Sequence, residues 1–139
     1  MYGQKAAAYR DAEILGTSRE QLVPLLYRHL LIYLRKGAQQ IQERDLEGKA
    51  ESLSRASDIL YELLGSLDPD QGGELADRLA GLYSYFLNEI REAGRTLDAG
   101  RLSRMISLVD SLHEAWAQAA RTVEGERRAG RGSGGAISV

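Results

Sequence analysis

Four segments of this chain repeat apolar residues at steps of three and four, and this periodicity limits the possible folds more than any other feature. Such spacing places apolar side chains on one side of an α-helix. Only Pro24 and Pro69 interrupt the 139 residues, and no stretch alternates apolar and polar residues long enough to form a strand. The sequence therefore predicts an all-α protein.

The expected helices cover about residues 18–43, 46–67, 74–96 and 101–122. Thr17 and Glu20 have the spacing of a capping box, and Asp45 is a suitable N-cap for the second helix. Pro24 predicts a distorted first turn or a late start of the first helix. The segment from Asp68 to Gly73 predicts a turn, because proline ends helices and glycine accepts positive φ.

Short connections make consecutive helices antiparallel neighbours. We therefore expect an antiparallel up-down-up-down four-helix bundle over residues 17–122. Residues 1–16 are expected to lie on or near the bundle. Residues 123–139 are rich in glycine and charge, so we expect a flexible tail there.

The helices carry more apolar residues than the stripe that a bundle needs. On the first helix, Leu25 and Ile32 fall opposite the main apolar side, beside Arg28 and Arg35. The second helix has a predicted seam formed by Leu46, Ala50, Leu53, Ser57, Leu60, Leu64 and Leu67. Additional stripes are predicted from Ala56, Ile59 and Leu63 on the second helix, and from Leu108 and Ala115 on the fourth. Either a partner's helices cover these stripes or the bundle's own core buries them, and the pattern alone leaves both interpretations open.

Composition excludes several classes of protein. Without cysteine there is no disulfide and no thiolate zinc site, which favours a reducing cytoplasm. A net charge of −2 argues against general binding to nucleic acid. The N-terminus lacks the apolar stretch of a signal peptide, and no apolar run approaches the roughly 20 residues that span a bilayer, so we expect neither secretion by that route nor membrane insertion.

The sequence predicts no catalytic, cofactor-binding or metal-binding residues, and therefore no enzyme. Neither His29 nor His113 has the glutamate three positions earlier that di-iron bundles use. The pair Gly72-Gly73 lacks the following lysine of a phosphate-binding loop, so a turn is the simpler interpretation. A cofactor-binding bundle would carry bound metal or a chromophore, which is a direct test of that alternative.

Four stretches resemble the flagellin-specific export chaperones, the FliS family, over roughly residues 9–120. They are Tyr9 and Ile14 followed by Thr17-Ser18; Leu22-Val23 with Leu26-Tyr27, Leu30 and Leu34; Leu67-Asp68 with Gly72-Gly73-Glu74-Leu75-Ala76, Leu79, Leu82-Tyr83 and Tyr85; and Leu112 with Glu114-Ala115-Trp116. The chain differs from the family pattern after Tyr27, where Arg28 and His29 replace an acidic and a small residue.

The resemblance implies a cytoplasmic chaperone that binds the C-terminal segment of flagellin, prevents its premature polymerisation and delivers it to the flagellar type III export apparatus. It also implies that the N-terminal segment lies near the client path, with Tyr9 and Ile14 as a displaceable plug. The resemblance and the additional stripes together predict a client surface. Its residues are Tyr9, Ile14, Tyr27, Leu31, Ile59, Leu63, Tyr83 and Tyr85. The alternative is a helical adaptor or a secretion chaperone for a different client, and the sequence is compatible with a monomer or a homodimer.

Overall fold

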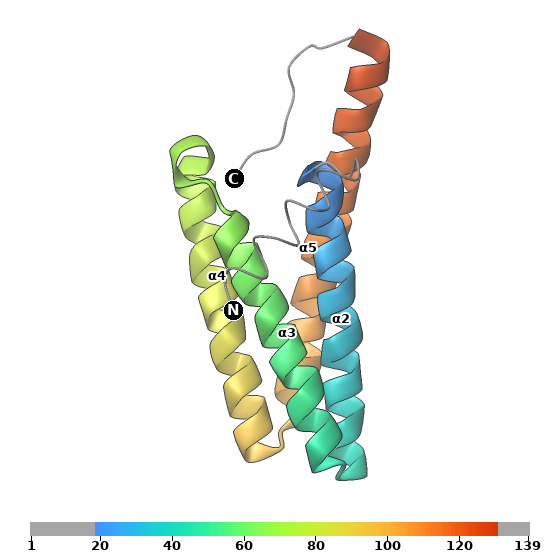
Figure 1. Ribbon diagram of the computed structural model, residues 1–139, viewed down its shortest axis with the longest axis vertical. Helices are drawn as coiled ribbons and strands as arrows, with labels where there is room; N and C mark the ends of the chain where they lie inside the picture. The colour runs from blue at the N-terminus through green and yellow to red at the C-terminus, as the bar shows by residue number, and fades with distance from the viewer. Residues whose placement is uncertain (1–18, 131–139) are drawn as a thin grey trace.

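A computed structural model describes residues 19–130 as four long helices packed side by side (Figure 1). The helices are α2 (Arg19–Glu43), α3 (Leu46–Ser66), α4 (Pro69–Thr96) and α5 (Ala99–Gly130). No strand occurs within this range. The predicted all-α fold and the four-helix bundle are confirmed. Segment 1–16, which contains Tyr9 and Ile14, lies outside the described residues, and so does Thr17.

The helices form a ring in which each one contacts the next. α2 packs most extensively against α5 and α3, whereas α4 contacts α3 and α5 less extensively. α2 and α4 therefore lie diagonally across the bundle. In Figure 1, α4 and α5 leave their short connection at the bottom and lean to opposite sides of the view.

α3 and α4 each begin after an aspartate that serves as the N-cap. Asp45 caps α3 by accepting a hydrogen bond from the backbone N–H of Gly48 at 3.0 Å, as predicted. Asp68 caps α4 in the same way, with the N–H groups of Asp70 and Gln71 as donors. α2 already begins at Arg19 and continues through Pro24. Of the two alternatives expected from Pro24, the late start is therefore wrong, and the distorted first turn stays a prediction.

Gly73 is the one position where α4 leaves helical geometry, with φ 52° and ψ −127°. L-amino acids with a Cβ atom rarely adopt this conformation, so glycine is required there. The predicted turn is thus a single helical turn beginning at Pro69, followed by a break at Gly73 and then the long part of α4.

α5 continues to Gly130, eight residues beyond its predicted end, so the helix extends into the segment expected to be a tail. Val123 is buried, and Arg128 pairs with Glu124 one turn earlier at 3.6 Å. Charged residues at this spacing stabilise a helix that composition alone had suggested would be disordered. Residues 131–139 lie outside the described part of the chain.

The predicted seam of α3 is rotated relative to the real one. Leu53 and Leu60 are buried as expected, but Leu46 and Ala50 are exposed. The real core face of α3 is Ser52, Leu53, Ala56, Ile59, Leu60 and Leu63. One reason is the close approach of α2 at Gly37, where a Cβ atom would lie 2.6 Å from Cδ2 of Leu53. The absence of a side chain at Gly37 allows these two helices to pack closely.

Candidate protein-binding surface

Most of the predicted client-binding residues that the structure describes belong to the core. Tyr27, Leu31, Ile59, Leu63 and Tyr83 are all buried. Of the two interpretations left open for the stripe Ala56, Ile59 and Leu63, the structure supports burial in the bundle's own core. A client could reach these five residues only if the helices moved apart, and their contact with a client stays a prediction.

Two of these residues form a polar cluster in the middle of the bundle. The hydroxyl groups of Tyr27 and Tyr83 lie 2.5 Å apart, and Nε1–H of Trp116 donates to the Tyr27 hydroxyl at 3.1 Å. The ring of Tyr27 packs edge-on against both other rings, with centroids 6.3 and 6.4 Å away. The cluster joins α2, α4 and α5, and it holds the diagonal pair α2 and α4 together across the core.

Burial raises the pKa of both Tyr27 and Tyr83 above the ordinary value of 10.0. At Tyr27, the hydrogen bonds with Tyr83 and Trp116 oppose part of this rise in pKa. At Tyr83, the neighbouring phenol adds to it. Both groups are therefore neutral at physiological pH and act as structural hydrogen-bonding groups.

Tyr85 is the one predicted client-binding residue among residues 19–130 that is well exposed, and other exposed apolar residues occur on α4 and on the neighbouring α5. Leu75 and Tyr85 on α4 are 50% and 51% exposed, and Leu108 on α5 is 49% exposed. Ala115 is also exposed, and Leu82 and Leu112 are half-buried at the edge of the core. We call these six residues the α4–α5 face: Leu75, Leu82, Tyr85, Leu108, Leu112 and Ala115.

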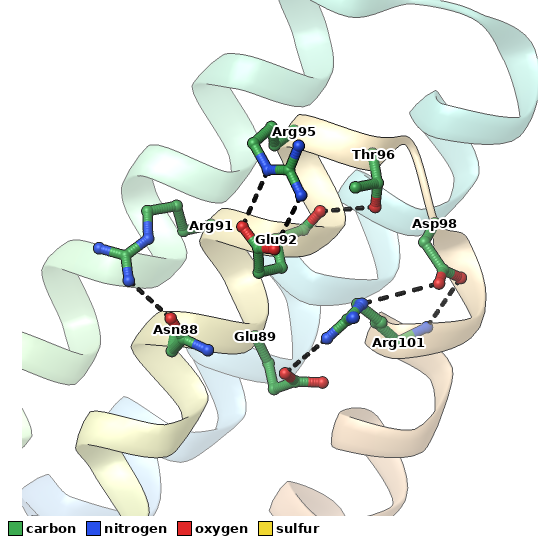
Figure 2. A network of polar contacts seen from close by, with 8 residues as sticks. All are labelled: Asn88, Glu89, Arg91, Glu92, Arg95, Thr96, Asp98 and Arg101. Atoms are coloured by element: carbon green, nitrogen blue, oxygen red, sulfur yellow. Dashed lines mark hydrogen bonds and ion pairs between the residues drawn. The ribbon is translucent and has the colours of Figure 1, made fainter.

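An ion pair between α4 and α5 fixes which residues of the two helices are neighbours. Nη1 of Arg101 lies 2.8 Å from Oε2 of Glu89, as Figure 2 shows. Positions seven or fourteen residues away lie on nearly the same side of a helix. Leu82 and Leu75 precede Glu89 by seven and fourteen residues, and Leu108 and Ala115 follow Arg101 by seven and fourteen. Because the helices are antiparallel, Leu82 corresponds in height to Leu108, and Leu75 to Ala115, on the two sides of the α4–α5 boundary, which widens away from the connection (Figure 1).

A polar network holds the end of this boundary that lies next to the α4–α5 connection (Figure 2). Arg101 also lies 3.7 Å from the carboxylate of Asp98, whose side chain accepts from the Arg101 backbone N–H. Nearby, Arg95 donates two hydrogen bonds to Glu92, which lowers the pKa of that carboxyl group. The network anchors α4 to α5 near their connection, beyond which the apolar residues of the α4–α5 face are exposed.

The described residues contain neither a cluster of metal ligands nor a helix that could span a membrane. Within residues 19–130, no group of three or more histidine and acidic side chains is placed to hold a metal ion. No helix in that range is both long enough and apolar enough to cross a membrane.

Comparison with known proteins identifies the family. The family model described as "Flagellar protein FliS" matches residues 1–123. The chain belongs to the FliS family. The flagellar secretion chaperone FliS of Bacillus subtilis (strain 168) is 30% identical over 128 residues, covering 92% of each chain. That of Salmonella typhimurium is 30% identical over 119 residues, covering 84% of this chain and 88% of the relative. That of Vibrio cholerae is 28% identical over 108 residues, covering 78% and 79%.

The aromatic cluster is formed by residues from the stretches that resemble the FliS family. Tyr27, Tyr83 and Trp116 came from three separate stretches of the resembling sequence, and the fold brings them into hydrogen-bonding contact. Sequence reasoning took the two tyrosines as client contacts and missed their mutual bond. The composition did contain a signal for this bond: the chain has seven tyrosines and one tryptophan but only one phenylalanine. Tyrosine and tryptophan need polar partners when they are buried, so some of them were to be expected in hydrogen-bonding contact.

Proposed function

We propose that this chain is a flagellar export chaperone that binds the C-terminal segment of flagellin in the cytoplasm and presents it to the type III export apparatus. The α4–α5 face is its proposed docking surface. Membership of the FliS family supports the role, and the exposed apolar residues along the boundary of α4 and α5 support the location.

The chemistry of the client determines what kind of surface a carrier needs. The resemblance implies a client segment that polymerises, and an amphipathic helix that polymerises must bury its apolar side against another protein. A carrier has to cover that side reversibly, which an apolar surface on a preformed bundle can do. The α4–α5 face provides Tyr85, whose ring can pack on apolar side chains while its hydroxyl stays in water.

The buried residues have a supporting part in this proposal. Tyr83 and Phe86 flank Tyr85 on the core side of α4, and the Tyr85 and Phe86 rings lie 5.9 Å apart. They fix the position of α4 and hence of the exposed ring. Tyr9 and Ile14 remain proposed as a plug near the client path, outside the described residues.

Calorimetric titration with the last several dozen residues of flagellin tests the proposal. We expect saturable binding with a negative heat-capacity change, because apolar surface is buried. A matched peptide from the N-terminal end of flagellin serves as the control. Equal binding of both peptides would favour a general adaptor, and no binding by a well-folded sample would refute the proposal.

A further inference from the structure

The outward side of α2 carries exposed apolar residues that the bundle does not use. Leu25 and Ile32 are 40% and 42% exposed. They are seven residues apart, so they lie on nearly one line along the helix, about 10.5 Å from each other. We call the following residues the outer α2 face: Leu25, Arg28, His29, Ile32, Arg35 and Lys36. All except the two apolar residues can carry positive charge, and all six are exposed.

This face is a cationic region on a chain with net charge −2. No aspartate or glutamate occurs in α2 between Gln21 and Gln42. No ion pair is found for Arg28 with any residue of the described range, and Arg35 has only Asp110 of α5, 4.0 Å away with both side chains more than half exposed. Such exposed pairs contribute about 0 to 1 kcal/mol, so Arg35 can exchange Asp110 for another carboxylate at little cost.

The outer α2 face is presented rigidly and lies away from the α4–α5 face. α2 makes the most extensive contacts in the bundle, with α3 on one side and α5 on the other. Its inward residues Leu30 and Leu34 are fully buried. Because α2 and α4 are diagonal, a protein on the outer α2 face would leave the α4–α5 face uncovered.

We propose that the outer α2 face binds an acidic amphipathic helix of a second protein, distinct from the client. The matching helix presents apolar residues seven positions apart to Leu25 and Ile32. Its carboxylates flank that stripe and pair with Arg28, Arg35 and Lys36. This proposal goes beyond the proposed client-binding function and concerns a different surface.

Two other occupants fit the same residues less well. In a symmetric dimer of this chain, the outer α2 face would meet itself, which brings arginine against arginine. A membrane surface requires a broad apolar side on the binding helix, whereas the opposite side of α2 is committed to the core and only two apolar residues remain outside. A partner helix needs only that narrow stripe and the surrounding positive charge.

A charge-exchange experiment tests the proposal with two synthetic helical peptides. Both have leucine every seven residues, flanked by glutamate in one peptide and by lysine in the other. Amide chemical shifts of the full chain are followed during titration at low salt. We expect the glutamate peptide to bind at least tenfold more tightly than the lysine peptide, with shift changes centred on residues 25–36. Added salt should weaken that binding.

Variants make the test specific. Arg28→Glu/Arg35→Glu should lose at least tenfold in affinity for the glutamate peptide and gain affinity for the lysine peptide. The control Arg78→Glu/Arg91→Glu changes the net charge equally, but on α4, and should bind like the parent protein. Circular dichroism of each variant should match the parent, since all four arginines are exposed.

Three results would overturn the proposal. They are shift changes centred away from α2, equal binding of the two peptides, and binding of phosphatidylserine-containing vesicles through residues 25–36 without binding of the glutamate peptide. Flagellin titration of Arg28→Glu/Arg35→Glu keeps the two ideas separate. Client binding is expected to be unchanged in this variant, whichever way the peptide experiment turns out.

Discussion

The aromatic cluster offers a quantitative test of how the core is held together. The Tyr27 hydroxyl is its central atom, because it contacts both the Tyr83 hydroxyl and Nε1–H of Trp116. Tyr27→Phe therefore removes a partner from two groups, whereas Tyr83→Phe removes a partner from one. The two substitutions delete the same chemical group, so the difference between them reports the bonding.

The expected magnitudes follow from burial. Tyr83 is 1% exposed, so Tyr27→Phe leaves its hydroxyl without water or protein partner, at about 1–3 kcal/mol. Trp116 is only half-buried, and its lost bond adds about 0.5–1.5 kcal/mol. Tyr83→Phe leaves Tyr27 still accepting from Trp116 and should cost about 0.5–1.5 kcal/mol. In the double variant neither hydroxyl is present, so none is left buried without a partner. Its loss in free energy of unfolding should therefore be at least about 1 kcal/mol smaller than the sum of the losses in the two single variants.

Urea denaturation of the parent and the three variants measures these free energies of unfolding. Trp116 is the only tryptophan, so its fluorescence reports directly from the cluster, and far-ultraviolet circular dichroism reports the helices. Additive costs within about 0.5 kcal/mol would refute the bonding scheme. So would a cost for Tyr83→Phe equal to that for Tyr27→Phe.

Other consequences follow from the core and the backbone. Burial raises the pKa of Tyr27 and Tyr83, so above pH 10.0 the unfolded chain loses protons that the folded chain keeps. The free energy of unfolding should then fall with rising pH, by about 1.4 kcal/mol per pH unit for each tyrosine. Urea midpoints compared between pH 9 and 11 measure this fall, which should be less steep in the double phenylalanine variant. Ile59→Asp or Leu63→Asp should unfold the protein, because each places a carboxylate in the core; retained helical circular dichroism at 25 °C would contradict the assignment of these residues to the core. Gly73→Ala should lower the free energy of unfolding by about 1 kcal/mol or more because of the positive φ, and a neutral or stabilising effect in urea would show that the break in α4 is not needed.

The sequence predicted helix ends and breaks correctly where the chemistry of neighbouring residues determines them. The cap at Asp45 and the turn glycine at Gly73 follow from side-chain bonding and from φ preferences, and both were found. The end of α5 was missed, because glycine and charge suggested a tail while burial of Val123 and the pair of Glu124 with Arg128 favour a helix. Composition does not contain that information.

The orientation of α3 could not be obtained from periodicity alone. Two apolar stripes overlap on this helix, the predicted seam and the core face that contains Ile59 and Leu63. Leu53 and Leu60 belong to both stripes. Which stripe faces inward depends on the partner helix, here on the close approach of Gly37 to Leu53. This error moved Ile59 and Leu63 from the core to the predicted surface. Tyr85 was predicted to lie on the surface, and it is exposed. Leu108 is also exposed, but the sequence assigned it only to an additional apolar stripe.

If the α4–α5 face receives the client, Tyr85→Asp/Leu108→Asp should weaken binding of the C-terminal flagellin segment, which calorimetry measures. Both residues are about half exposed, so the variant should keep its fold and its urea midpoint. Loss of at least a hundredfold in affinity is predicted, together with unchanged binding by the control Leu25→Asp/Ile32→Asp on the outer α2 face. Unchanged affinity in the α4–α5 variant, or an equal loss in the control, would contradict the account.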